Sequence, residues 1–338
     1  MKKNKRPDKK TLSDFHVLIE SDTDFAAYGR MLQSKWRINN NISIGTYKKK
    51  QKNGLVKEIE LGNFIEKNAA FKNGSNFLTD EIREVVKTEL LNKQKGAKIE
   101  VNRLYRNLLS SQPLAFNLFA TLSKDKLLAT KFFSDLFPDR IKEVTEILFE
   151  HSPGRRDHEY TGDSSAFDVF VIYISPNGLK GFAGIEVKYA ENLKDTPSSH
   201  KTRYVELTTE SQVFVDDISK LKQKPIQQIW RDHLLSISLL KHKTPIYQDG
   251  FFIYLYPKDN TECENAVAKY IEQFKSYNPD TKYHDEKLTG FYPRYMKNFM
   301  IKLRQLISDD WTKELLQRYF DDTTMIEETR ESFQNAES

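Results

Sequence analysis

Cysteine is nearly absent from this 338-residue chain, which contains only Cys263. A single cysteine excludes an internal disulfide framework, and no group of cysteine and histidine residues has the spacing of a zinc site. The sequence therefore excludes two devices that stabilise small domains. It fits a reducing, cytoplasmic environment.

Long apolar runs are also missing. No stretch approaches the roughly 18 to 20 consecutive apolar residues that a membrane span requires. Residues 1–10 carry several positive charges, but no apolar segment follows them as it would in a secretory signal. We therefore expect a cytoplasmic protein that is not exported and has no membrane partner.

Aromatic residues are plentiful, with 22 Phe and 16 Tyr, and 38% of the chain is hydrophobic. This composition excludes a largely disordered chain, even though 30% of the residues are charged. The net charge of +5 permits a polyanionic partner without requiring one. Positive charges concentrate at residues 2–10 and 48–52, for which a solvated tail and a loop are the simpler interpretation.

Helical spacing of apolar residues dominates the first half of the chain. It predicts helices over 12–34 and 79–93, the second with Thr79 as its N-cap, and an irregular or extended segment over 36–61. Between 101 and 150 the apolar positions recur at three and four residues, which predicts two or three more helices.

The pattern changes at Phe167. Residues 167–174 are apolar at nearly every position and 181–189 are rich in β-branched and aromatic side chains, so both are expected to be core strands. The segment Ser175-Pro176-Asn177-Gly178 between them favours a tight turn and hence a hairpin. We expect a helix over 219–241, a third strand over 251–256, and helices over 264–275, 294–307 and 311–320.

These elements predict an α/β fold in which a mixed β-sheet is flanked by helices, with additional helices at both ends. We divide the chain into a disordered basic tip at 1–11, an N-terminal helical and irregular region packed on the core at 12–100, the core at 101–260, a C-terminal helical extension at 261–322 and a frayed tail at 323–338.

The hairpin brings three charged residues together. If Ser175 lies opposite Gly181, Asp168 faces Glu186 or Lys188, and the alternation of side chains puts all three on one face of the sheet. Unpaired charges in such an apolar setting would be costly, whereas carboxylates that bind a divalent cation avoid that penalty. Their position therefore suggests a function.

Phosphodiester hydrolysis is the chemistry that this group fits. Carboxylates of Asp168 and Glu186 are hard oxygen ligands for Mg²⁺, for which Mn²⁺ could substitute, and the ammonium of Lys188 would orient or deprotonate the attacking water. The alternative is a structural salt bridge between Lys188 and one of the acids. An acid two residues before a lysine also occurs at 8–10, 280–282 and 285–287, but in polar sequence outside any predicted strand.

Several longer motifs carry a resemblance to a known family. The segments at 110–119 (SSQPLAFNLF), 149–150 (FE), 161–168 (TGDSSAFD) and 184–191 (GIEVKYAE) occur in the order found in that family. The chain resembles the PD-(D/E)XK nuclease superfamily, and within it a group of restriction-endonuclease-like proteins, over residues 36–256.

The resemblance implies a restriction-endonuclease-like core: a helix that carries an acid, a mixed sheet with the Asp and Glu-x-Lys strands, and a covering helix with a polar residue that faces the site. The positions that match its catalytic pattern are Asp168, Glu186, Lys188, Glu150 for the helix acid and Gln228 for the covering helix.

The resemblance also implies a metal site. Its ligands would be Asp168, Glu186, Glu150 and the backbone carbonyl of Val187, whose apolar side chain is expected to point into the core. Glu146, one helical turn before Glu150, is the alternative helix acid.

Other polar and aromatic residues have simpler roles. His233 is expected to be a packing residue of its helix, and Trp36 to lie in the core, although it could stack on a nucleic acid. Ser110, Ser111, Gln112 and Asn117 could contact phosphate or cap helices, and Asn117 could equally brace the site.

Together these observations predict a Mg²⁺-dependent endonuclease that acts on DNA. It could act as a homodimer, because many relatives pair to cut both strands. The resemblance further connects it with restriction or defence. The main alternative is a nucleic-acid-binding module that has kept the fold and lost turnover, and a protein-binding scaffold is a third possibility.

Overall fold

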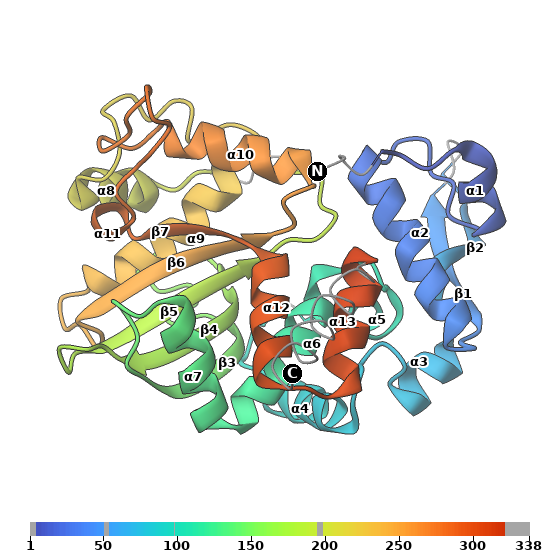
Figure 1. The fold of residues 1–338 in the computed structure, drawn as a ribbon. Coiled ribbons are helices and arrows are strands. Elements are labelled where there is room, and N and C mark those ends of the chain that lie inside the picture. Colours follow the sequence, from blue (N-terminus) through green and yellow to red (C-terminus); the bar gives the residue numbers. More distant parts are fainter. Residues whose placement is uncertain (1–4, 51–53, 98, 195–198, 322–338) are drawn as a thin grey trace, which may run out of the picture.

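The computed structural model describes residues 5–50, 54–97, 99–194 and 199–321 (Figure 1). Its helices are α1 (Lys9–Asp14), α2 (Asp24–Asn39), α3 (Lys67–Asn73), α4 (Asp80–Asn92), α5 (Val101–Arg106), α6 (Ser111–Lys124), α7 (Lys126–Leu136), α8 (Thr202–Ser211), α9 (Gln227–Leu240), α10 (Thr261–Ile271), α11 (Glu286–Thr289), α12 (Met296–Leu306) and α13 (Asp310–Phe320). Its strands are β1 (Ile44–Lys50), β2 (Val56–Ile65), β3 (Glu143–His151), β4 (Phe167–Ile174), β5 (Lys180–Val187), β6 (Asp249–Tyr256) and β7 (Phe291–Tyr295). Within these described ranges, no helix has both the length and the apolar character needed to cross a membrane.

A five-stranded mixed sheet in the order β3-β4-β5-β6-β7 forms the centre of the fold. β3, β4 and β5 are antiparallel neighbours, whereas β5, β6 and β7 run parallel. Gly178 closes the β4–β5 turn at a φ of 78°, which glycine adopts without steric cost. The parallel step from β5 to β6 requires a long crossover, and α8 and α9 lie in it. The predicted α/β class and the predicted hairpin are confirmed.

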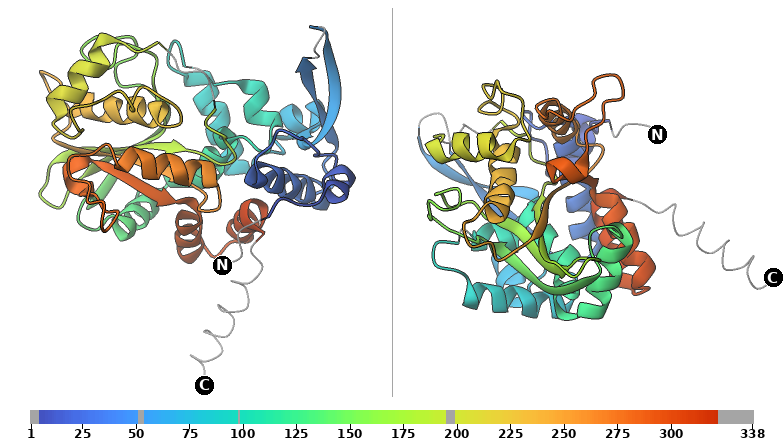
Figure 2. Two further views of the ribbon diagram at one scale, coloured as in Figure 1. Left: turned by 90° about the horizontal axis from the view of Figure 1, so that it is seen from above. Right: turned by 90° about the vertical axis from the view of Figure 1, so that its left-hand side faces the viewer.

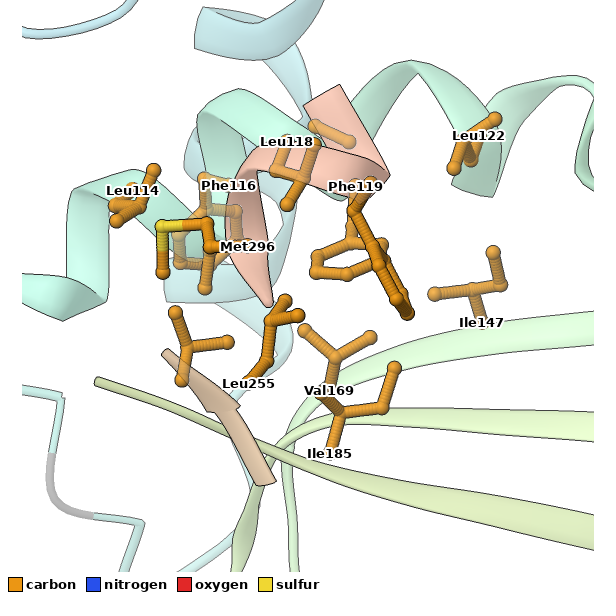
Figure 3. Close-up of a cluster of buried hydrophobic side chains, with 14 of the residues drawn as sticks. Leu114, Phe116, Leu118, Phe119, Leu122, Ile147, Val169, Ile185, Leu255 and Met296 are labelled. Carbon is orange, nitrogen blue, oxygen red and sulfur yellow. The ribbon is translucent and has the colours of Figure 1, made fainter. Parts of the chain in front are cut away.

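Helices cover both faces of this sheet (Figures 1 and 2). On one face α6, α7, α12 and α13 contribute to a hydrophobic core that includes Val169 and Ile185, and Figure 3 shows part of this core. On the other face α8, α9 and α10 pack against Phe170 and Phe182. Burial on both sides explains why β4 and β5 are apolar at almost every position. It also makes the charged residues on these strands exceptional.

The N-terminal part, with α1, α2 and the β1–β2 ribbon, lies at the opposite end of the molecule from α8 (Figure 2). Trp36 of α2 is buried, its Nε1 donates a hydrogen bond of 2.7 Å to Oε1 of Glu314, and the Arg318 guanidinium lies 4.0 Å from its ring centre. Both partners belong to α13, so this helix joins the N-terminal part to the core. Trp36 is therefore a packing residue.

The prediction of helix up to residue 150 was wrong, because residues 143–151 form strand β3. A β-bulge between Val144 and Glu146 shifts the alternation by one residue, so that Val144, Ile147 and Phe149 all face the core. With the preceding Ile141, the buried positions are separated by three, three and two residues, which resembles the spacing of a helix. Glu150 is accordingly a strand residue.

The N-terminal boundaries also differ from the prediction. The expected helix over 12–34 is two helices, because Thr23 caps a new start by accepting a hydrogen bond of 3.2 Å from the Ala26 amide. Residues 9–11 belong to α1 and not to a disordered tip. The segment 36–61 contains the end of α2, all of β1 and part of β2. Helix α4, by contrast, begins after its predicted cap Thr79, which accepts a hydrogen bond from Ile82.

The later boundaries differ in two places. Helix α9 begins at Gln227 and not at 219, because Pro225 disfavours helical geometry in the residue before it. Strand β7 occupies the start of the helix predicted over 294–307 and joins the sheet, so the core extends past the expected limit at residue 260. The tail predicted at 323–338 lies outside the described residues.

Candidate active site

Four predicted site residues meet where two cavities adjoin. Glu150, Asp168, Glu186 and Gln228 line both cavities, and Lys188 lines the first. The first, of about 430 Å³, is bounded by residues of α2 and is called the α2 cavity here. The second, of about 720 Å³, is bounded by the β3–β4 loop, residues 152–166, and is called the loop cavity.

The strand register explains why the three acids meet. Phe149 of β3 faces Val169 of β4, which in turn faces Ile185 of β5. The next position along each strand holds Glu150, Asp168 and Glu186, so three neighbouring strands place a carboxyl group at the same level of the sheet. All three lie on the face covered by α9, which is opposite to the core face of Val169 and Ile185.

Strand geometry also places the Glu-x-Lys pair. Lys188 is two residues after Glu186 and therefore lies on the same face, as predicted, and its Nζ donates a hydrogen bond of 2.5 Å to Glu186 Oε1. Gln228 Nε2 donates to the same oxygen at 3.1 Å, which fixes the covering helix above the site. The observed pairing is offset by two residues from the predicted one, and an offset of two preserves the face.

Val187 has a buried side chain in the opposite core, as predicted. Its amide donates a hydrogen bond of 2.7 Å to Asp168 Oδ2. Because the N–H and C=O groups of a strand residue point toward the same neighbouring strand, the Val187 carbonyl is also directed toward the side on which Asp168 lies.

Burial and neighbouring charges shift the protonation of the acids. Burial, reinforced by the charges of Glu186 and Glu150, raises the pKa of Asp168 well above its usual value. Burial also raises the pKa of Glu150, opposed by a hydrogen bond of 2.7 Å from Gln112 Nε2 and reinforced by Glu186. Both acids therefore hold protons to a higher pH than ordinary carboxyl groups, and a bound cation would displace those protons.

Lys188 responds in the opposite way. Burial alone would lower its pKa, but the negative charges of Glu186, Glu191 and Asp168 outweigh burial and raise the pKa above the ordinary lysine value. The residue as a whole is only 6% exposed. It is therefore a buried ammonium whose charge depends on the surrounding acids.

The donor set fits a hard divalent cation. Within the described ranges, one oxygen of Asp168 and one of Glu186 make no hydrogen bond, and the Val187 carbonyl is directed to the same place. No three Asp, Glu, His or Cys side chains of the described residues already enclose a metal-sized space. Such a cation would therefore rely on two carboxylates, a carbonyl and water or substrate oxygens, the mixture that Mg²⁺ commonly takes.

Other residues singled out in the sequence have structural roles. His233 is buried, and its ring nitrogens bond to Tyr270 Oη at 2.8 Å and the Thr289 carbonyl at 2.9 Å, so it is a packing residue as predicted. Asn117 braces Leu78 and does not reach the acids. Glu146 is exposed away from the site, which leaves Glu150 as the matching acid.

Several site residues were not predicted. Ala26 and Arg30 of α2 form the far wall of the α2 cavity, together with Arg103 and Glu191. Asp232 lines the loop cavity and is 5% exposed, and burial, reinforced by Glu186, raises its pKa well above the usual value. Its position one helical turn after the predicted Gln228 was a usable signal, whereas nothing in the sequence connects α2 with the acids.

The chain matches the model of a known family. A family model described as the PD-(D/E)XK nuclease superfamily matches residues 20–321. The chain belongs to the PD-(D/E)XK nuclease superfamily. The matched segment is longer than the 36–256 expected from the motifs and includes both cavity walls. Searches of curated proteins and of solved structures gave no match.

Membership of this nuclease superfamily connects the geometry with phosphodiester hydrolysis in general. Asp168 lies on β4, Glu186 and Val187 lie at the end of β5, and Lys188 follows that strand directly, so the structure brings together the Asp and Glu-x-Lys residues that the sequence predicted. One feature departs from the expected pattern, because Glu150 reaches the site from strand β3 and not from a helix.

Proposed function

We propose that this nuclease-superfamily chain is a divalent-metal-dependent endonuclease that hydrolyses phosphodiester bonds in DNA. The observation that carries the proposal is the convergence of Asp168, Glu186 and Lys188 on one sheet face, at the junction of two cavities. Cavities on both sides of the acids can hold a strand that continues in both directions, which suits cleavage within a strand. A buried structural salt bridge would not require cavities or a third acid.

Asp168, Glu186 and the Val187 carbonyl would hold the cation, with Glu150 in position to bind it through water. Mg²⁺ is the expected ion and Mn²⁺ can substitute, because both favour oxygen ligands. When bound, the ion supplies a Lewis acid for a phosphate oxygen and lowers the pKa of a bound water. Asp168 and Glu150 have raised pKa values, so a bound cation would replace protons on these carboxyl groups and stabilise their charged form.

Lys188 acts as a positive charge and not as a base. Its raised pKa keeps the ammonium protonated at neutral pH, so it can orient a water molecule and stabilise the negative charge that develops on the phosphate. The amide groups of Gln228 and Gln112 hold Glu186 and Glu150 in place without neutralising them. The acids therefore remain able to attract a cation.

The test uses closed circular substrates, which have no ends. Supercoiled plasmid and circular single-stranded DNA are incubated with the full chain in Mg²⁺, Mn²⁺ or EDTA. We expect nicked or linear products that disappear with EDTA and in Lys188→Ala and Asp168→Asn. Lys131→Ala, on the exposed side of α7, is the control that keeps activity.

Cleavage that persists in both site variants would reject the assigned site. Salt-sensitive DNA binding without metal-dependent cleavage would favour the inactive binding module. We further propose a role in restriction or defence, and pairing of two subunits to cut both strands.

A further inference from the structure

The loop cavity differs from the α2 cavity in how its cations are paired. In the α2 cavity, Arg30 pairs with Asp22 at 2.6 Å and Arg103 with Glu191 at 3.6 Å. In the loop cavity, three cations from Arg155, Arg156 and Lys201 have no ion pair with a carboxylate of the described residues. Positive charge is therefore available on one side of the acids and largely neutralised on the other.

Arg155 is a partly buried cation of this wall, whereas Arg156 is exposed. Its Nη1 donates to the carbonyl oxygens of Gly96 at 3.0 Å and Ser164 at 3.2 Å, which anchors the side chain. Its Nε and Nη2 are buried and have no hydrogen-bond partner among the described residues. These two nitrogens form one edge of the guanidinium, and such an edge matches two oxygens of a phosphate.

The β3–β4 loop is held in a fixed conformation by Asp163, which belongs to the 161–168 motif. Its Oδ1 accepts hydrogen bonds from Thr161 Oγ1 at 2.8 Å and the Ser165 amide at 2.9 Å, and its Oδ2 accepts from Ser165 Oγ at 2.9 Å and from Tyr204 Oη. These contacts lower the pKa of Asp163 against the opposing effect of burial, so it is a stable carboxylate. Both carboxylate oxygens of Asp163 are therefore used in hydrogen bonds that hold the loop.

The loop connects directly to the acids. It begins just after the β3 strand that carries Glu150 and ends at the β4 strand that carries Asp168. The Lys201 ammonium donates to the Gly162 carbonyl, which joins the opposite wall of the cavity to the same loop. A group bound by the loop would therefore keep a fixed position relative to the acids.

We propose that Arg155, assisted by Arg156 and Lys201, binds a backbone phosphate of the nucleic-acid strand next to the phosphate that is cleaved. The strand runs from the acids into the loop cavity, and Asp163 is a positioning residue that holds the loop for this contact. This inference rests on the proposed nuclease function, because it takes a polynucleotide as the ligand. The two cavities then have unequal roles, because the loop cavity binds the nucleic-acid backbone more strongly than the α2 cavity.

The test measures binding separately from cleavage. A fluorescein-labelled single-stranded oligonucleotide is titrated with the protein, and binding is followed by fluorescence anisotropy at several salt concentrations. Ca²⁺ replaces Mg²⁺, and a gel checks that the oligonucleotide stays intact. The variants are Arg155→Gln, whose amide can still donate to Ser164, and Lys201→Gln. The control is Lys142→Gln, an exposed lysine directly before β3, roughly 26 Å from Glu150 by strand rise.

Arg155→Gln should weaken binding about 10-fold, the effect of losing a charged hydrogen bond. It should also reduce the slope of log K against log salt by about 0.7, as expected for one lost phosphate contact on a single strand. Lys201→Gln should weaken binding about three-fold, and Lys142→Gln should have no effect. If Arg155→Gln melts like wild type and keeps the same affinity and slope, the inference is wrong.

The second variant decides the case in which Arg155→Gln does not fold. Lys201→Gln with unchanged affinity and salt slope would then overturn the proposal. The two proposals also fail separately. If wild type cuts DNA with Mg²⁺ but Arg155→Gln binds normally, only the phosphate contact is rejected. If Arg155→Gln loses binding while wild type never cuts, only the nuclease function is rejected.

Discussion

Replacing Lys188 with methionine should destabilise the protein in the absence of metal. The change removes an ammonium from a buried pair whose side chains are 8% and 9% exposed, and leaves Glu186 beside other buried acids. Breaking such a pair costs about 3 to 5 kcal/mol. We expect the lower limit, about 3 kcal/mol, because Glu186 keeps its hydrogen bond from Gln228 and the acids can take up protons. With about 2.1 cal/mol/K of unfolding entropy per residue, a 338-residue chain should melt about 4 °C lower.

Differential scanning calorimetry with and without Ca²⁺ measures this effect. A cation at one hundred times its Kd stabilises the folded state by about 2.7 kcal/mol, so Ca²⁺ should restore most of the lost melting temperature in Lys188→Met. Lys131→Met is the control, because its ion pair with Asp135 is 62% exposed on the lysine side and should contribute below about 1 kcal/mol. A Lys188→Met protein that melts like wild type without Ca²⁺ would refute the reasoning.

Three more predictions concern the site and its support. Divalent-cation affinity should rise with pH, because Asp168 and Glu150, with their raised pKa values, must release protons when the cation binds. Titration calorimetry in buffers of different ionisation enthalpy measures this proton release, and no release on cation binding would contradict the prediction. Thr79→Ala should cost about 1 kcal/mol in urea unfolding through loss of a helix cap, with cleavage unchanged. Gly184→Ala should lower the free energy of unfolding by about 1 to 3 kcal/mol and slow cleavage, because the added β-carbon would overlap the ring of Phe167, the residue before Asp168. A variant that melts at the wild-type temperature would contradict this prediction.

The hairpin was predictable because its signals are local. Two apolar strands on either side of Ser175-Pro176-Asn177-Gly178 fix which residues face each other to within two positions. An error of two does not change the face of a side chain, so Asp168, Glu186 and Lys188 were assigned to one face despite the offset. Strand alternation tolerates this error, and one residue of shift would have separated the acids.

Glu150 shows where a local pattern misleads. The bulge in β3 produces buried positions at Val144, Ile147 and Phe149, and periodicity alone does not distinguish this spacing from a helix. The β-branched residues Val144, Thr145 and Ile147 were a signal for strand that the spacing outweighed. Glu150 does lie beside Asp168 and Glu186, as its motif predicted, but on a strand and not on a helix.

The walls of the site depend on contacts between distant segments. Arg30 of α2 and Glu191 after β5 line the same cavity although 161 positions separate them in the chain. Similarly, Arg155 faces the acids only because the loop is folded around Asp163. No periodicity in a single segment contains this information, and the α2 wall in particular forms only when α13 docks the N-terminal part on the core.

The choice of neighbouring groups keeps the acids available for a cation. Glu150 and Glu186 each receive a hydrogen bond from an amide, Gln112 and Gln228, and an amide fixes a carboxylate without cancelling its charge. Lys188 is the one ammonium that pairs with these acids within the described ranges. Three carboxylates with one ammonium leave negative charge that a divalent cation can neutralise, and this excess adds to burial in raising the pKa values of Glu150 and Asp168. A purely structural ion pair would need neither the excess charge nor the cavities, so the balance of charges itself argues for metal binding at this site.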